Sequence, residues 1–294
     1  MSAPDISIVT PSFNMLPFLK RCAASVRDQG VNLEHIVVDG GSSDGTPTWL
    51  TGETGILSVS EKDKGMYNAL NKAIRRSTAE IVGHLNCDEQ YLPGTLRRVL
   101  DYFASHPHVD FVASDFLVIN SQGNFLAYRK SFQPRWPYFF SNYLYTTTCT
   151  LFYRRRVFDK VMFDESYRSI ADVIFLYNVI KAGFRGAHLP GYAATFTYSG
   201  TNLSLHPISG QEKKRFLSTL PFWFRVLRPL FFMSFFAEKL LHGNYRESSS
   251  LRYAIYSGED LGQRRGFTID HPGFRLRFVP LEQQYQKGES ANLS

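Results

Sequence analysis

A short acidic cluster follows an apolar run in the first third of the chain. Residues 81–85 are apolar, and the run ends abruptly at Asn86, Asp88 and Glu89. This pattern predicts a buried strand that delivers oxygen-rich side chains to the edge of an open α/β sheet, where ligands bind. Such side chains suit Mg²⁺ or Mn²⁺, and either cation suits a diphosphate. On this cluster alone a helix start is the favoured interpretation, because acids favour helix N-termini.

A second polar strand end lies at Asp39, which precedes the glycine-rich loop 40–45. The loop has neither the spacing of a dinucleotide-binding fingerprint nor the Lys-Ser/Thr ending of a P-loop. It is either a turn in which Asp44 forms an Asx-turn or a cap, or a place where Asp39 accepts a hydrogen bond from a base or ribose. The residue types do not decide between these two interpretations.

The charged loop 61–65 follows a third apolar run. It is either solvated surface or part of a site. In a site, Gly65 would permit a close approach of the backbone, and Asp63 would orient a ribose or sugar hydroxyl. Asn68 and Asn71 then place polar groups near the start of the following helix.

Ser169 and Asp172 precede an apolar helical segment. Their spacing is typical of a capping box, in which Ser169 caps the helix and Asp172 reaches back. The functional alternative is that Asp172 is a general base at the mouth of a cleft. Spacing alone favours the cap. His188 and His206 are more often structural at such positions, so neither is assigned to a metal.

These residues require a scaffold that brings strand ends together. Strand-like runs at 6–10, 36–38, 56–60 and 81–85 alternate with helical patterns at 16–29, from 46 onward and at 66–77. This alternation predicts a parallel, doubly wound sheet. Because parallel strands end on one side, Asp39, the loop 61–65 and residues 86–89 are expected to gather on one edge.

The second half is less regular. Strand patterns are expected at 109–115 and 116–119, a hairpin turn at 121–124 leading into 125–128, a strand at 150–153, and a helix at 172–182 closed by Gly183. Residues 135–145 are aromatic and irregular. The end, from Glu282 onward, is polar and expected to fray.

Residues 211–242 are both aromatic and basic. Pro221, Arg225, Arg228 and Pro229 interrupt the segment, so no transmembrane helix is predicted. A basic, aromatic, amphipathic stretch is typical of a membrane interface. The alternative is an ordinary helix pair that packs on the catalytic domain.

The bulk composition excludes several classes of protein. The chain has 294 residues, 44% of them hydrophobic, and a formal net charge of +7, so it can bury a full core and favours anionic partners. It shows no nucleic-acid-binding signature. Its three cysteines lie far apart, which argues against a disulfide framework. No signal peptide is recognised at the N-terminus, so a cytoplasmic location is expected.

Four segments in order, residues 10–14, 37–46, 60–72 and 85–89, together resemble family 2 glycosyltransferases, most of all the bacterial subgroup that builds exopolysaccharide, capsule or O-antigen chains. The resemblance covers roughly the first 200 residues. It implies an α/β GT-A fold, with a doubly wound, mostly parallel, Rossmann-like sheet. The implied catalytic domain spans 1–205, with a nucleotide-sugar-binding half at 1–100 and an acceptor half at 101–205. A basic, aromatic helical extension with a polar tail would follow at 206–294.

The resemblance also implies roles for single residues. Those implied to bind the nucleotide sugar are Thr10, Pro11, Asn14, Asp39, Asp63, Gly65, Asn68, Asn86, Cys87 and Asp88. Asp39 would bind the base, usually uracil, Asp88 would be the main contact of a Mn²⁺ or Mg²⁺ ion, and Asp172 would be the catalytic base. The sequence departs from the family pattern at Asn86, where Asp is common, and at Val173 and Ile174, which replace an aromatic and an acidic residue.

The expected reaction is an inverting transfer from a nucleoside-diphosphate sugar, with UDP as the expected nucleotide, to a glycan or lipid-linked acceptor. Residues 211–242 would hold the enzyme at the inner face of the cytoplasmic membrane. One alternative is a nucleotidyltransferase, but these commonly have a glycine-rich basic loop after the first strand, and residues 11–14 offer none. The other alternative is a non-catalytic nucleotide-sugar or glycan-binding protein. Asn86 in the metal motif is the only residue that favours it.

Overall fold

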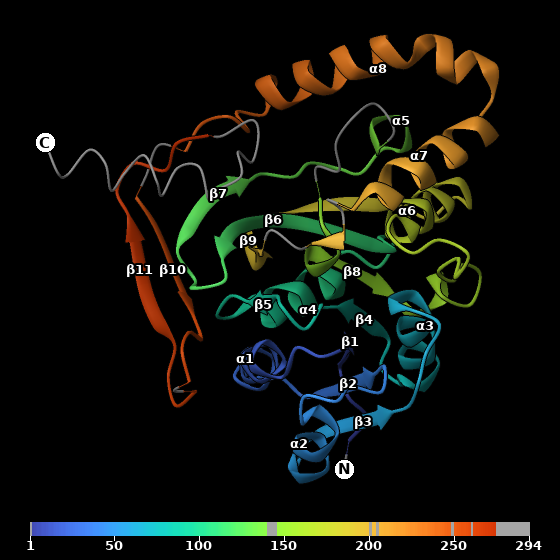
Figure 1. Cartoon of the computed structure of the whole chain (residues 1–294). Helices are drawn as coiled ribbons and strands as arrows, with labels where there is room; N and C mark the ends of the chain where they lie inside the picture. The colour runs from blue at the N-terminus through green and yellow to red at the C-terminus, as the bar shows by residue number, and fades with distance from the viewer. Residues whose placement is uncertain are drawn as a thin grey trace, which may run out of the picture.

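Strands and helices alternate from the N-terminus, as predicted (Figure 1). The computed structural model describes residues 2–139, 146–199, 202–203, 206–247, 250–259 and 261–274. Its first elements are β1 (Ile6–Ser12), α1 (Leu16–Arg27), β2 (Leu33–Asp39), α2 (Thr46–Gly52), β3 (Ile56–Ser60), α3 (Met66–Arg76) and β4 (Ile81–His84). Then come β5 (Gln90–Tyr91), α4 (Thr95–Ser105), β6 (Phe111–Asn120), β7 (Phe125–Arg129), α5 (Trp136–Phe139), β8 (Leu151–Arg154), α6 (Ala171–Lys181) and β9 (Gly186–Tyr198). The last are α7 (Pro207–Thr219), α8 (Phe222–Leu241), β10 (Leu251–Ile255) and β11 (Arg265–Ile269).

One large sheet runs through the molecule in the order β3-β2-β1-β4-β8-β6-β9-β5, with β7 paired to β6. The strands β3, β2, β1 and β4 are parallel to their neighbours, and so are β6 and β9. The pairs β4–β8, β6–β8, β6–β7 and β5–β9 are antiparallel. The predicted α/β fold is confirmed, and each antiparallel pair includes at least one strand that follows residue 110.

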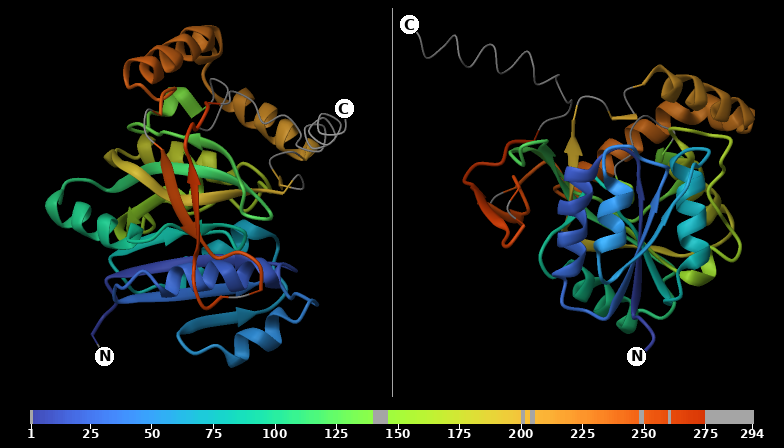
Figure 2. Two further views of the ribbon diagram at one scale, coloured as in Figure 1. Left: turned by 90° about the vertical axis from the view of Figure 1, so that its left-hand side faces the viewer. Right: turned by 60° about the horizontal axis from the view of Figure 1, so that its bottom comes forward.

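Helices cover both faces of this sheet (Figure 2). On one face α1 and α4 bury Cys22, Val26 and Leu96 against the strands, and on the other α3 and α6 bury Leu70 and Phe175. A parallel sheet needs this double cover because its strands are apolar on both sides.

The runs expected at 109–115 and 116–119 form a single strand, β6, although its register with β9 shifts on both sides of Asp115. The Asp115 carboxylate interrupts the apolar pattern but is buried and paired. It accepts hydrogen bonds from the backbone N–H groups of Ser131 (2.7 Å) and Gly191 (3.1 Å) and lies 2.8 Å from Nε2 of His188. A charge satisfied in this way does not end a strand. Of the segments expected to be irregular, 140–145 lies outside the described residues, as does the tail from Glu282.

The C-terminal helices α7 and α8 are bent by 120° relative to each other. In the described part of the chain no single helix has the length and apolar composition of a membrane span, although this bent pair passes the same test when its two helices are taken together. α8 lies on the outside of the molecule, at the end opposite to β3 (Figure 1).

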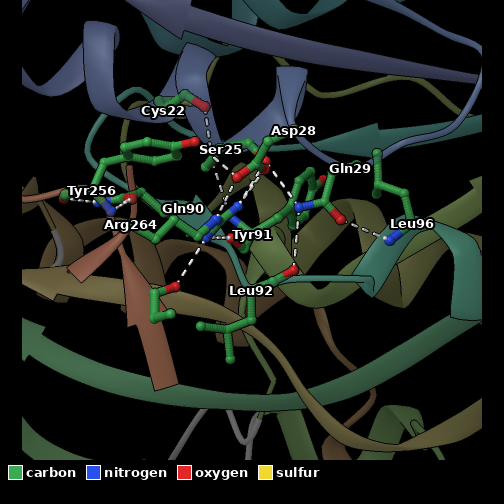
Figure 3. A network of polar contacts seen from close by, with 11 residues as sticks. Cys22, Ser25, Asp28, Gln29, Gln90, Tyr91, Leu92, Leu96, Tyr256 and Arg264 are labelled. Carbon is green, nitrogen blue, oxygen red and sulfur yellow. Dashed lines mark hydrogen bonds and ion pairs between the residues drawn. The ribbon is translucent and has the colours of Figure 1, made fainter. Parts of the chain in front are cut away.

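The hairpin formed by β10 and β11 was not predicted and follows these helices. It lies along the side of the sheet (Figure 2) and packs Leu251, Tyr253 and Ile255 against β6 and β7 residues such as Leu117 and Tyr128. Close to its turn, Arg264 reaches the first half of the chain (Figure 3). The C-terminal segment is therefore part of the folded body rather than only a helical extension.

Candidate functional site

The carboxyl ends of the parallel strands meet on one edge, as predicted. Asp39 at the end of β2 pairs in register with Ser12 on β1 and with Ser60 on β3. The N–H of Leu85, just beyond β4, donates to the carbonyl of Val9 on β1 (3.1 Å). The loops that follow these strands therefore lie side by side.

Asp39 organises the loop 40–45. Its carboxylate is fully buried and accepts hydrogen bonds from the N–H groups of Gly41 (3.2 Å) and Ser42 (3.0 Å), from the Ser60 hydroxyl (2.7 Å) and from the Ser42 hydroxyl. These contacts hold the Asp39 carboxylate against the backbone of the loop. Its contact with a nucleotide base stays a prediction.

Asp44 and Asn14 tie this loop to the turn after β1. Asp44 Oδ1 accepts from the N–H (3.1 Å) and hydroxyl (2.6 Å) of Thr46, and its Oδ2 accepts from the N–H of Leu16 (2.8 Å). The Asx-turn interpretation of Asp44 is thus confirmed, whereas the N-cap residue of α2 is Gly45, with no side-chain cap. Asn14 has a φ of 51°, donates its N–H to Ser42 Oγ (2.7 Å) and accepts from the N–H of Ser43 (2.8 Å).

Phe13, Gly40 and Asp63 lie close together. A Cβ at Gly40 would lie 2.7 Å from Oδ2 of Asp63 and 3.3 Å from the Phe13 ring, so only glycine leaves room for both side chains. The other oxygen of Asp63 accepts from the N–H of Gly65 (2.7 Å), which has a φ of 122°. Phe13 is 59% exposed. An exposed ring beside a fixed carboxylate can stack on a base while the acid meets a hydroxyl.

Three residues implied to bind the nucleotide sugar are buried inside the fold. The Thr10 hydroxyl lies 3.0 Å from Nε2 of His35, beneath α1, and Pro11 is buried within β1. Cys87 is buried against Met15. These side chains can shape the loops, but a ligand at the strand ends would meet backbone atoms at Thr10 and Pro11.

Asn86 is held by the protein. Its Oδ1 lies 2.9 Å from Nε2 of His84, and its Nδ2 donates to Thr148 Oγ1 (3.4 Å). Burial lowers the pKa of His84 to about 4, so the ring is neutral at pH 7. The N–H of Asn86 donates to the buried Glu89 (2.8 Å). Asn86 therefore builds the turn that presents Asp88.

Asp88 fits a divalent metal ion bound together with a diphosphate. Its carboxylate is partly exposed, and no described side chain donates a hydrogen bond to it; Thr197 donates to its backbone carbonyl. Burial raises the pKa of Asp88, and burial together with the charge of Asp88 raises that of Glu89. Among the described residues, no group of three or more His, Cys, Asp or Glu side chains is placed to hold a metal. A single carboxylate suits Mg²⁺, which takes most of its ligands from phosphate and water.

Asp172 lies in the first turn of α6, where it receives a hydrogen bond that the sequence did not indicate. The Tyr67 hydroxyl lies 3.2 Å from Asp172 Oδ1 and 3.0 Å from the carbonyl oxygen of Ser169. Burial raises the pKa of Asp172 to about 6, against the lowering effect of hydrogen bonds from the Val173 backbone and Tyr67. The predicted capping box is wrong, because Ser169 makes no cap of α6 and its hydroxyl donates to the Leu203 carbonyl (3.3 Å).

Tyr67 also connects Asp172 to the strand-end loops, because α3 begins directly after Asp63 and Gly65. Asn68 and Asn71 on the same helix donate to the two carboxylate oxygens of Glu165 (2.8 Å each). The Asn68 side chain therefore links α3 to the segment before α6. Sequence reasoning missed Tyr67 and Glu165 because their partners lie 105 and up to 97 residues away in the sequence.

Comparison with known proteins shows which family this chain resembles. The model of the family described as Glycosyl transferase family 2 matches residues 7–162. An uncharacterized glycosyltransferase of Mycobacterium tuberculosis is 39% identical over 94 residues, 31% of this chain and 36% of the relative. A PGL/p-HBAD biosynthesis glycosyltransferase of Mycobacterium bovis is 31% identical over 126 residues, 40% of this chain and 49% of the relative. The matches thus span half or less of these relatives.

Solved structures show the same fold at low sequence identity. S. aureus TarS (residues 1–349), in complex with UDP-GlcNAc, superposes with a TM-score of 0.60 at 17% identity, covering 81% of this chain and 73% of that one. The mannosyltransferase PcManGT from Pyrobaculum calidifontis, in complex with GDP-Man and Mn²⁺, gives a TM-score of 0.56 at 14% identity, covering 100% and 82%.

Proposed function

The chain belongs to glycosyl transferase family 2, and from that premise we propose that it transfers a sugar, with inversion, from a nucleoside-diphosphate donor to a glycan or lipid-linked hydroxyl. The observation that carries the proposal is the placement of Asp172. Its carboxylate is fixed by Tyr67, on the helix that continues from the Asp63–Gly65 loop. The Tyr67 hydrogen bond therefore connects Asp172 to the loop 63–65 and to the neighbouring strand ends.

In this proposal the acceptor oxygen attacks the anomeric carbon from the side opposite the diphosphate. Asp172 takes the hydroxyl proton as the new carbon–oxygen bond forms. The bond to the diphosphate breaks, and the diphosphate leaves with the electron pair. A single displacement of this kind needs no enzyme nucleophile. A Mn²⁺ or Mg²⁺ ion held by Asp88 would, when bound, neutralise negative charge on the diphosphate.

UDP is the proposed donor nucleotide. The UDP-GlcNAc complex of TarS supports this choice, while the GDP-Man complex of PcManGT keeps GDP as a competitor. The exposed Phe13 ring supports a stacked base of either kind, and Asp63 beside it supports a ribose contact.

The deciding experiment is calorimetric titration of the protein with UDP, GDP and dTDP, each with and without Mn²⁺. We expect UDP to bind most tightly and to need the metal. Phe13→Ala should weaken UDP about 10- to 100-fold, because stacking on an aromatic ring contributes ~1–3 kcal/mol per base. Phe18→Ala, a second phenylalanine on the nearby α1, is the matched control and should bind UDP like the wild type. Failure of all three nucleotides to bind the folded protein would remove the basis for the transferase mechanism.

We also propose that α7 and α8 bind an anionic membrane surface, which would place the enzyme on the inner face of the cytoplasmic membrane. Phe222 (73%), Leu230 (59%), Met233 (66%) and Leu241 (86%) are exposed large apolar residues on α8. Such a row on an amphipathic helix is typical of interfacial binding.

The charges of the helix pair support an anionic partner. Both of its carboxylates are turned inward: Glu212 accepts from backbone N–H groups before α6, and Glu238 accepts from the Tyr138 hydroxyl (2.8 Å). Arg225 is exposed and lies over the Phe222 ring (5.8 Å), so a cation accompanies the apolar row. No exposed acid on these two helices opposes anionic lipid.

Replacing Leu230 and Met233 together by Glu should reduce binding to phosphatidylglycerol-containing vesicles more than ~10-fold, because two buried apolar contacts are lost and two repelled charges gained. Vesicle co-sedimentation measures the effect. Leu57→Glu is the matched control, since Leu57 is 57% exposed but lies on β3. Equal losses in both variants, or a wild type that ignores these vesicles, would contradict the proposal.

A further inference from the structure

Glu212 on α7 binds the backbone directly before the helix that carries Asp172. Its carboxylate is buried and accepts hydrogen bonds from the N–H groups of Arg168 (2.6 Å), Ser169 (2.9 Å) and Ile170 (3.3 Å). A helix leaves its first N–H groups without partners, and a carboxylate there is stabilising. Of these three N–H groups only that of Ile170 belongs to the N-cap residue of α6, and the other two belong to the segment before it. Glu212, more than 40 residues along the chain, therefore holds the segment that leads into α6.

The peptide groups before α6 are held from two sides. Glu212 binds the N–H of Ser169, and the Tyr67 hydroxyl lies 3.0 Å from the carbonyl oxygen of the same residue. Asp172 follows three residues later, within reach of that same hydroxyl. Any shift of α7 relative to α3 therefore moves the carboxylate of Asp172.

We propose that Glu212 and Tyr67 are positioning residues for Asp172, and that α7 is thereby part of the catalytic unit rather than only a membrane anchor. The inference rests on the proposed function, in which Asp172 is the base. It also connects the C-terminal helices to the position of Asp172, because α7 is followed, through Pro221, by the exposed helix α8. Binding of α8 to a surface would act on the same contact that fixes the base.

The two residues should move the pKa of Asp172 in opposite directions. The groups that face its carboxyl are Tyr67 from α3 and Tyr153 from β8, while Glu212 from α7 lies behind the N-terminus of the helix. Tyr67→Phe removes a donor to the charged form, which raises the pKa. Glu212→Gln removes a negative charge that offsets the positive end of the helix dipole, which lowers the pKa.

The test is the pH profile of kcat/KM, whose acid limb reports the base in the free enzyme. We expect the limb to move up by about half a pH unit in Tyr67→Phe and down by about half a unit in Glu212→Gln. Both variants should lose about tenfold in kcat and keep the UDP affinity of the wild type. Glu238→Gln is the matched control, because it alters a partly buried, hydrogen-bonded carboxylate on α8 without touching α6.

The outcomes separate this inference from the proposed function. Full activity in Asp172→Asn would overturn the proposed function. An inactive Asp172→Asn together with wild-type kcat and an unmoved acid limb in both positioning variants would overturn only this inference. Shifts of equal sign would also overturn it, since a general loosening of the fold has no reason to lower the pKa in one variant and raise it in the other. If Glu212→Gln does not fold, Tyr67→Phe alone must still give its upward shift.

Discussion

Asp172→Asn should lower turnover ~10²–10⁴-fold and leave UDP affinity unchanged. Asparagine keeps the shape and can still accept the Tyr67 hydrogen bond, but it cannot take a proton from the acceptor. The measurement is release of UDP from the bound sugar nucleotide, with and without a bacterial lipid extract as the source of acceptor, beside the calorimetric titration. A non-catalytic sugar-binding protein would be indifferent to this change, so unaltered nucleotide release would support that alternative.

The pH dependence of the same residue gives a second readout. In the proposed mechanism Asp172 must be ionised to take the proton, and burial raises its pKa to about 6. We therefore expect kcat/KM to fall as the pH drops through about 6. Because the folded-state pKa lies above the usual value of 3.8, the stability that this group contributes is present below that value and is lost as the pH rises to about 6.

It follows that Asp172→Asn should unfold at a higher denaturant concentration than the wild type at pH 8. A gain of ~1–2 kcal/mol is expected, which is the usual trade between stability and activity at a catalytic site. The gain should vanish near pH 4, where the wild-type carboxyl is also neutral. An equal gain at both pH values would show that the charge of Asp172 is not its cause.

The sequence allowed the strand-end half of the site to be predicted, because its information is local. Each loop follows an apolar strand directly, so the position of Asp39, Asp63 or Asp88 in the sequence places it on the sheet edge. What could not be predicted are the contacts between distant segments. Ser169 and Asp172 have the spacing of a capping box, yet the segment before α6 is held by Glu212, and no local pattern marks that carboxylate.

Two differences in the second half of the chain have similar causes. Strands are expected separately at 109–115 and 116–119, and the structure joins them in β6. The three groups that satisfy the charge of Asp115 are supplied by distant segments, which a local pattern does not show. The strands β10 and β11 are short and separated by a polar stretch, so each lacks the length that makes a pattern distinctive. Their hairpin is fixed by what it packs against, and in particular by Arg264.

Arg264→Ala should lower the free energy of unfolding by ~1.5–3 kcal/mol, the range for losing hydrogen bonds to a charged group, because Asp28 is 33% exposed. The side chain is 9% exposed, and its guanidinium donates to both oxygens of Asp28 (2.6 Å each) and to the carbonyls of Tyr91 (2.8 Å), Ala254 (3.0 Å) and Ser25 (3.2 Å) (Figure 3). Removing it leaves the Asp28 carboxylate with the Tyr256 hydroxyl (2.8 Å) as its donor and takes one donor away from each of these carbonyls. Arg264→Lys should restore little, because an ammonium group cannot reproduce this fork.

Arg265→Ala is the matched control, since the neighbouring arginine is exposed and lies over the ring of Phe267 (5.3 Å), and its loss should stay within ~0.5 kcal/mol. Urea unfolding gives the change in the free energy of unfolding of each variant. Amide hydrogen exchange shows which parts of the chain are destabilised. We expect faster exchange in β10, in β11 and at β5, because Gln90 on β5 also bonds the backbone of Tyr256 in both directions (2.9 and 2.8 Å). β5 begins directly after Asp88 and Glu89. Faster exchange there would show that the C-terminal hairpin stabilises the turn that presents Asp88, whereas faster exchange confined to the hairpin would limit the role of Arg264 to holding the hairpin itself.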